Sequence, residues 1–332
     1  MHASNQIGTT TPRLAIAIGA ALLYAACAAG AQSWPVKSIR LVAPLAPGSS
    51  SNDILGRAVA QRLGEALGQS IVMDYRPGTA GNLGSSIAAR AAPDGYTLLL
   101  GYTSATMISP IVYPNSGYDP DTDLVPIVRL AVVPWVIVAH PSVQATTVKE
   151  LITLAMARPS QLNYASAGSG GLPHLAGELF KMSAKVDIVH VPYKGGALAV
   201  NDLVGGHVQL YFTGITGVAP FIRAGRLRGI AVATMRRSPL MPALPTVEES
   251  GLPGYDVVSA VGLLAPGKTP RTIVQRLYDE TVRVVNAPNM TSFIVSQGAE
   301  PALMDPAQFG AYIRAELSKW AHVVKVANIK PD

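Results

Sequence analysis

One unit recurs along the chain: a short apolar stretch, a turn rich in glycine, serine and threonine, and then a stretch with helical spacing. Residues 39–44 are apolar and run into the polar turn 47–53, and residues 54–67 then place their apolar side chains on one helical face. A short apolar run bounded by turn residues is typical of a buried strand. Strands that alternate with helices predict an α/β chain with mainly parallel sheets.

The same unit returns in both halves of the sequence. Further apolar stretches that lead into polar turns lie at 70–74, 96–101, 162–165, 187–191 and 208–212, and 227–233 is one more strand. In parallel sheets, ligands bind beyond the carboxyl ends of the strands. Because serine and threonine stand just beyond these ends, we favour a binding role for the turns over a purely structural one.

The length of the chain favours two domains. With 332 residues, 49% of them hydrophobic, the chain is too long for one ordinary core. A strand at 135–140 would open the second lobe, and a strand at 257–264 would return the chain to the first. Two such crossings form a hinge, and a hinge permits closure around a ligand.

These crossings set the predicted boundaries. We expect a first lobe of residues 32–132 and 259–332 and a second lobe of residues 133–258. The helices expected at 269–285 and 305–326 would then pack on the first lobe.

The first residues have the features of a targeting signal. Arg13 precedes the apolar run 14–23, and small residues follow up to an A-x-A cleavage site that ends at Ala31. The run is too short for a permanent membrane anchor. A competing interpretation is lipidation at Cys27, but the aliphatic residue expected three places earlier is Tyr24. We favour a signal peptide of residues 1–31 and a periplasmic location.

Composition excludes several classes of function. Cys27 is the only cysteine, so cleavage after Ala31 leaves no thiol for disulfides, metal ligation or nucleophilic catalysis. Six histidines without a metal-ligand spacing argue against a catalytic metal. The turn at 78–84 lacks the first G-x-G of a dinucleotide loop, so no cofactor is expected. The net charge of +6 gently favours anionic ligands, and no basic run with interleaved aromatics points to nucleic acid.

The turns themselves suit an anion. Each presents backbone N–H groups, several at a helix N-terminus, where the helix dipole favours a carboxylate. Hydroxyl groups add donors without a buried countercharge. The alternative is that Ser49, Ser51, Ser166 and Ser169 only cap helices, and the sequence leaves both interpretations open.

One turn permits an enzyme hypothesis. Residues 167–171 read Ala-Gly-Ser-Gly-Gly between a strand and a helix, like a nucleophile elbow centred on Ser169. His174, His190 or His207 would be the base and Asp202 the acid. An elbow enzyme carries its histidine late, after the acid, and the only late histidine here, His322, lies within a predicted helix. We therefore hold a serine hydrolase as the weaker alternative and expect no catalytic residues.

Taken in order, the motifs resemble a known family. The matching stretches lie at 46–48 with 53–55, 76–84, 92–98, 162–168 with 173–178, 190–195, and 237–254. They are similar to those of the extracytoplasmic solute receptors of tripartite tricarboxylate transporters, the Bordetella uptake gene type. The ordered set covers nearly all of the chain from Trp34 onward.

The resemblance implies a type II periplasmic binding protein fold, with two α/β lobes joined by a two-crossing hinge. It implies capture of a dicarboxylate, tricarboxylate or related carboxylate, aromatic ones included, and delivery to the membrane subunits of a transporter. It implies no catalysis, and we expect a monomer. A ligand-sensing subunit for a membrane kinase would use the same fold and stays open as an alternative.

The resemblance also carries a set of binding residues onto this chain. In such receptors, the turns of the first lobe hold one carboxylate through backbone amides, hydroxyls and bridging waters. The implied ligand-binding residues are Gly48, Ser49, Ser50, Ser51, Asn52, Thr79, Ala80, Gly81, Thr103 and Ser104 of the first lobe, and Ser166, Gly168, Ser169, His174, Thr213 and Gly214 of the second.

Three positions depart from the family pattern. The turn at 47–53 is one residue longer than usual, so the hydroxyl that faces the ligand is not fixed by the motif. Thr79 replaces a small residue. Thr213 and Gly214 stand where many members carry Asp or Asn, so we predict a ligand without an ammonium group. Tyr102, Met107 and Tyr193 could line an apolar section of the site, but we favour ordinary packing for them.

Overall fold

The computed structural model describes residues 34–48 and 50–330. The predicted signal peptide with Ala31 and Cys27, and the candidate binding residue Ser49, lie outside the described residues. All elements below belong to the unit of the chain that begins at Lys37.

The first sheet is built from the N-terminal units of the sequence. Strand β1 (Ile39–Ala43) pairs in parallel with β2 (Ile71–Tyr75) and β3 (Thr97–Tyr102). Two antiparallel neighbours extend the sheet, because β3 pairs with β9 (Val258–Pro266) and β9 pairs with β4 (Leu124–Ala139). Strand β10 (Glu300–Met304) lies on β4. The central strand β3 is almost entirely buried, as its continuous apolar sequence predicts.

The second sheet shares β4 with the first. Residues Trp135 to Ala139 of β4 pair with β7 (Leu210–Gly214) and, over nearly the same stretch, with β8 (Arg228–Val232). Strand β5 (Asn163–Ser166) then pairs in parallel with β7 and with β6 (Val189–Pro192). The strand order is therefore β2-β1-β3-β9-β4-β7-β5-β6.

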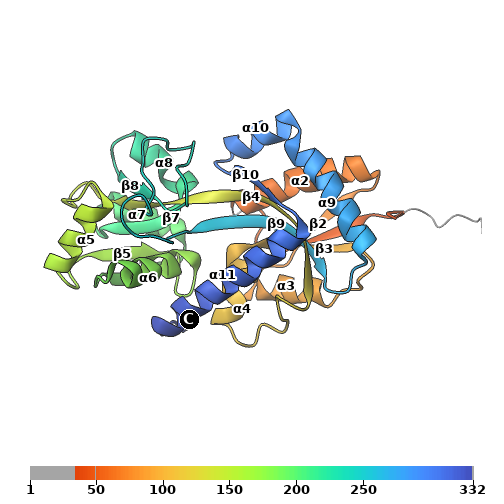
Figure 1. Cartoon of the computed structure of the whole chain (residues 1–332), viewed down its shortest axis with the longest axis horizontal. Coiled ribbons are helices and arrows are strands. Elements are labelled where there is room, and N and C mark those ends of the chain that lie inside the picture. The colour runs from red at the N-terminus through yellow and green to blue at the C-terminus, as the bar shows by residue number, and fades with distance from the viewer. Residues whose placement is uncertain (1–33, 49, 331–332) are drawn as a thin grey trace, which may run out of the picture. The chain divides into compact units, whose positions relative to one another are not determined.

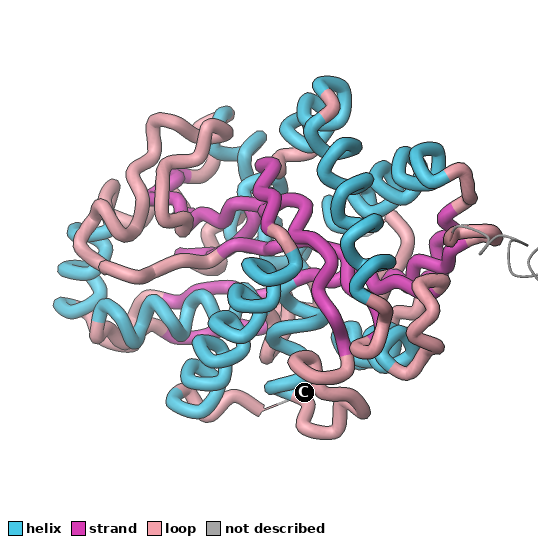
Figure 2. The backbone as a smooth tube through the Cα atoms, turned by 45° about the vertical axis from the view of Figure 1, so that its right-hand side comes forward, coloured by secondary structure: helices cyan, strands magenta, loops and turns pink. Residues whose placement is uncertain are grey.

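Helices cover these strands on the outside, as Figures 1 and 2 show. The helices that belong to the first lobe are α2 (Ser51–Leu67), η1 (Thr79–Gly81), α3 (Asn82–Ala89), η2 (Thr103–Ile108), α4 (Ser109–Val112), α9 (Arg271–Asn286) and α10 (Pro288–Ser296). Those of the second lobe are α5 (Val148–Ala157), α6 (Leu172–Ala184), α7 (Gly196–Val204) and α8 (Ile215–Arg223). None of the described helices is both long enough and apolar enough to cross a membrane.

The two lobes are joined where β4 changes partner. Up to Pro134 the strand pairs with β9, and from Trp135 it pairs with β7. Strand β9 begins at Val258 and leads the chain back into the first sheet. The two crossings therefore coincide with β4 and with the start of β9. The boundaries at 132/133 and 258/259 stay a prediction.

The last helix, α11 (Pro306–Val326), spans both lobes. Its first half packs Phe309 and Ile313 into the core around β1 and β3. Its second half buries Trp320 and Val323 in the core of the second lobe, where the helix reaches α6 (Figure 1). The helix therefore packs on both lobes, whereas from the sequence we expected it on the first. A helix of 21 residues is about 30 Å long, which is enough to cross the hinge.

Candidate functional site

The turn before α2 is organised by a buried carboxylate that the sequence reading did not single out as functional. Asp53 is fully buried and accepts the N–H of Gly48 at 2.7 Å and the hydroxyl of Tyr75 at 2.8 Å. Arg57 lies 3.3 Å from the same carboxylate. Through these contacts, a side chain of α2 fixes the conformation of the turn that precedes the helix. Asp53 therefore has a structural role. Its position as the third residue of the helix is the sequence signal that could have identified this role.

The candidate residues of this turn differ in their surroundings. Ser50 is the N-cap of α2, yet its hydroxyl makes no capping hydrogen bond. Ser51 is the first helical residue and is half-buried, and Asn52 is buried. The interpretation that Ser51 merely caps the helix therefore does not hold, because the cap position belongs to Ser50.

The second turn, at η1, is strained. Thr79 and Ala80 have φ angles of 47° and 52°, between Gly78 at 134° and Gly81 at 99°. A β-branched residue such as threonine rarely occupies the left-handed region, since its side chain crowds the backbone there. Such strain concentrates at binding sites, and consecutive N–H groups in these conformations form anion-binding concavities.

Two hydrogen bonds from the following segment hold this turn. The Ser109 hydroxyl donates to the carbonyl of Thr79 at 3.2 Å, and the Asn82 N–H donates to the same carbonyl. Gly81 packs so closely on Ala105 that a Cβ added there would lie 2.5 Å from the Ala105 Cβ. The turn is therefore positioned by backbone packing and by its carbonyl.

Thr103 and Ser104 have different roles. The Thr103 side chain is buried, donates to the carbonyl of Val258 at 3.3 Å and accepts the N–H of Ala260 at 2.9 Å. Its hydroxyl is thus used to hold β9 against the end of β3. Ser104, the next residue, lines the cavity described below.

In the second lobe, a side-chain network holds the turn after β5. The buried Ser166 hydroxyl lies 2.6 Å from His190 Nε2 and 3.0 Å from the carbonyl of Gly168, and it accepts the Gly168 N–H at 3.2 Å. The His190 ring stacks on His174, with ring centres 3.7 Å apart and planes within 8°. The Gly170 N–H donates to His174 Nδ1 at 3.1 Å. The hydrogen bonds of Ser166 and His174 therefore hold the turn in its conformation.

Tyr164 extends this network into the core. Its hydroxyl donates to Glu178 at 2.6 Å, and its ring stacks on His190. Burial, together with the charge of Glu178, raises the pKa of Tyr164 far above its ordinary value. The hydroxyl therefore stays protonated and remains a donor to Glu178.

A cavity of about 250 Å³ lies where the turns of the two lobes meet. It contains four of the predicted binding residues and six others. The residues that line it are Ala80, Ser104, Ile108, Ser109, Tyr113, Ala167, Gly168, Ser169, Gly170 and Gly171. A Cβ on Gly170 would lie 2.8 Å from Val112, so the lobes are in contact beside this cavity.

The other predicted residues lie around the cavity or away from it. Thr79 and Gly81 flank Ala80 in the strained turn, whereas Gly48, Ser50 and Asn52 do not line this cavity. Thr213 and Gly214 end β7, where Gly214 is the N-cap of α8, and they do not line it either.

The apolar wall of the cavity comes from side chains that sequence reasoning missed. Ile108 and Tyr113 lie there, and nothing in their local sequence marks them as binding residues. Of the three side chains considered for this role, Met107 is buried, Tyr102 donates to the carbonyl of Pro44 at 3.1 Å, and Tyr193 donates to Asp202 at 2.8 Å. Burial raises the pKa of Tyr102 to about 12. Ordinary packing is the better description of all three.

The geometry disfavours the hydrolase hypothesis. In a catalytic triad, Nδ1 of the histidine donates its proton to the acid. Here, Nδ1 of His174 accepts an N–H from Gly170, and the Asp202 carboxylate accepts the hydroxyl of Tyr193. His174 and Asp202 are thus engaged in contacts other than those of a catalytic triad.

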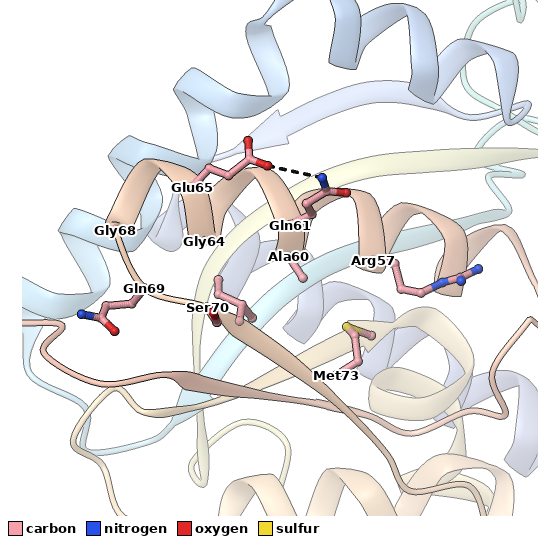
Figure 3. A pocket seen from close by; sticks show the side chains of 10 residues that line it. Arg57, Ala60, Gln61, Gly64, Glu65, Gly68, Gln69, Ser70 and Met73 are labelled. Atoms are coloured by element: carbon pink, nitrogen blue, oxygen red, sulfur yellow. Dashed lines mark hydrogen bonds between the residues drawn. The ribbon is translucent and has the colours of Figure 1, made fainter.

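A larger cavity, of about 540 Å³, lies elsewhere (Figure 3). It runs along α2 and the edge strand β2, between Arg57 and Gln69, and contains none of the predicted binding residues. All of its walls belong to the first lobe, so closure of the lobes would not enclose a ligand there.

Comparison with known proteins gives a consistent result. The family model described as tripartite tricarboxylate transporter family receptor matches residues 55–329. Protein BugT of Bordetella pertussis is 33% identical over 96% of this chain and 98% of its own length.

Solved structures agree with that match. The Rpa4515 protein of R. palustris, solved with adipate, is 37% identical with a TM-score of 0.76, and the alignment covers 90% of this chain and all of that one. MatC of Rhodopseudomonas palustris, solved with malate, is 29% identical with a TM-score of 0.71 over 88% of this chain and all of the other.

Proposed function

The chain belongs to the family of tripartite tricarboxylate transporter receptors, and on this premise we propose that it captures a small carboxylate between its two lobes and delivers it to the membrane subunits of a transporter. Its fold is that of the periplasmic binding proteins of this family. The family is one of receptors, so the chain is a solute-binding protein and not an enzyme. We propose that it works in the periplasm as a monomer.

The observation that carries this proposal is the chemistry of the cavity walls. The strained turn around Ala80 and the glycine turn 167–171 face one space from the two lobes. Among the residues that the structure describes, no carboxylate and no cationic side chain lines that space. Backbone N–H groups and hydroxyls bind a carboxylate without a buried countercharge, which would cost desolvation free energy.

We assign the direct contacts to the residues that line the cavity. Ser104 and Ser169 would donate their hydroxyls, and Ala80 would donate its N–H, while Gly168, whose own N–H is held by Ser166, would line the site with its backbone. Thr79, Gly81, Ser166 and His174 would position these turns. Gly48, Ser50, Ser51, Asn52, Thr213 and Gly214 would be brought to the ligand by closure about β4 and β9, and the same role is proposed for Ser49.

Two relatives support the ligand class. The structures with adipate and with malate both hold aliphatic dicarboxylates, which differ in length. Ile108 and Tyr113 add an apolar wall that would contact the body of such a molecule, whether aliphatic or aromatic. We therefore place dicarboxylates first among the candidates and keep the expectation that an ammonium group finds no partner.

The test is a thermal-shift screen of mono-, di- and tricarboxylates, followed by calorimetry of the hits. A ligand that binds only the folded state raises the melting temperature. Ser169→Ala should weaken binding of the best hit by about ten-fold, because one hydrogen bond to a charged group is lost. Ser318→Ala, on an exposed face of α11, is the matched control and should leave binding unchanged.

Two results would count against the proposal. One is that no carboxylate raises the melting temperature. The other is that Ser169→Ala leaves the affinity as it is. Aspartate or glutamate binding as tightly as the unsubstituted dicarboxylate would contradict the expectation about the ammonium group.

A further inference from the structure

A second cavity between the lobes shares no residue with the first. Its volume is about 340 Å³, and it lies between the start of α2, helix α8 and the turn from α10 to β10; Figure 1 shows α8 in the second lobe and α2 and α10 in the first. The residues that line it are Ser51, Ile215, Thr216, Ala219, Pro220, Arg223, Leu240, Val295, Ser296, Gln297 and Gly298. Cavities of this size are in the range that holds small molecules.

One cationic side chain stands in this wall. Arg223 lies in the last turn of α8 and is exposed. Within the part of the chain that the structure describes, its guanidinium forms no hydrogen bond and no ion pair. No carboxylate lines the cavity, so the charge of Arg223 is not balanced by a lining residue. Guanidinium groups bind carboxylates through two parallel hydrogen bonds.

The rest of the wall mixes apolar and polar side chains, the polar ones being Ser51, Thr216, Ser296 and Gln297. Ile215, Ala219 and Pro220 present one side of α8, and Leu240 and Val295 face it from two other segments. Val295 is 44% exposed and leaves apolar surface for a ligand to cover. A cation together with these aliphatic side chains suits a molecule with one anionic group and an apolar body.

Both lobes build this cavity, and they touch beside it. Gly298 of the first lobe packs on Thr216 of the second, since a Cβ on Gly298 would lie 2.2 Å from the Thr216 Cγ2. Nearby, the Ser238 hydroxyl of the second lobe donates to Glu300 of the first at 2.5 Å. A molecule in this cavity would contact both lobes in the arrangement that the structure shows, and would stabilise that arrangement through its differential affinity.

We propose that this cavity is a second binding site, selective for a monocarboxylate with an apolar body, and that Arg223 holds the carboxylate. The site is additional to the dicarboxylate site of the proposed function and shares no residue with the first cavity, although Ser51, which closure would bring to the dicarboxylate, also lines it. It differs from the first cavity in chemistry, because it offers a cationic side chain, Arg223, where the first cavity offers N–H groups and hydroxyls.

The experiment uses the chain with its first cavity filled by Ser169→Trp, and benzoate as the probe. Calorimetry should detect benzoate binding in this background and about ten-fold weaker binding or none once Arg223→Gln is added. Arg226→Gln removes the same charge three residues away, from a guanidinium that lies 5.5 Å from the Phe221 ring, and should leave the affinity unchanged. Benzamide, which has the ring but no charge, should not bind.

Arg223→Lys keeps the charge and separates a binding role from a folding role. Its affinity for benzoate should lie between those of the parent and of Arg223→Gln. The proposal is overturned by equal losses in Arg223→Gln and Arg226→Gln, by equal binding of benzamide, or by no benzoate binding at all. Each of these outcomes leaves the dicarboxylate screen untouched, so the two proposals fail separately.

Discussion

The two lobes hold their candidate binding turns by different means. In the first lobe, the turn at Thr79 and Ala80 is kept in a strained backbone conformation by tight packing of Gly81 on Ala105. In the second lobe, the turn after Ser166 contains glycines, which adopt its conformation without strain, and hydrogen bonds with Ser166 and His174 hold it. The turn of the first lobe thus depends on close packing, which a single added methyl group disturbs. The second depends on buried polar groups, which must all be satisfied.

The largest effect is expected for Gly81→Ala. Alanine at a φ of 99° is strained, and its Cβ would lie 2.5 Å from that of Ala105. Together these effects should lower the free energy of unfolding by about 3 kcal/mol. Urea unfolding measures the loss.

Gly68→Ala is the control for this experiment. Gly68 also has a positive φ, of 69°, but nothing lies within 4 Å of an added Cβ. Its substitution should cost only about 1 kcal/mol. Equal losses for the two substitutions would mean that packing on Ala105 does not hold the first turn.

A smaller effect is expected for Ser166→Ala. The substitution removes the partner of His190 Nε2 and of the Gly168 N–H in a buried place. Leaving buried polar groups unsatisfied should lower the free energy of unfolding by about 2 kcal/mol. Ligand affinity should fall as well, because the turn that carries Ser169 loses the hydrogen bonds that hold it.

Ser318→Ala again serves as the control and should stay within about 0.5 kcal/mol of the parent. If Ser166→Ala matched it in urea unfolding, the side-chain network would contribute nothing and the contrast between the lobes would disappear.

The same contrast explains how far the sequence could predict the site. Strands and turns were predictable because apolar runs and glycine-rich turns are local signals, and Ala80, Ser104, Gly168 and Ser169 do reach one cavity. The sequence could not tell that the hydroxyls of Thr103 and Ser166 point into the protein, since direction depends on β9 and on His190.

The sequence also could not predict the side chains whose position depends on packing against segments that are distant in the chain. Ile108 and Tyr113 become cavity walls only because the second lobe packs beside them. Helix α11 reads as one amphipathic segment, and only the position of the second lobe decides where Trp320 is buried. The family resemblance identified the fold, but it placed neither of these features.

The smallest effect should be a gain in stability, from Thr79→Asn. Asparagine adopts the left-handed conformation more readily than a β-branched residue, because it lacks the second substituent on Cβ. With φ at 47° in the parent, relief of strain should raise the free energy of unfolding by about 0.5 to 1 kcal/mol. Thr153→Asn, at an exposed position within α5, is the matched control and should bring no gain, since threonine is unstrained in a helix. Urea unfolding of both variants measures the two changes in the free energy of unfolding. A loss of stability in Thr79→Asn would show that the threonine side chain itself holds the turn, and the first lobe would then resemble the second.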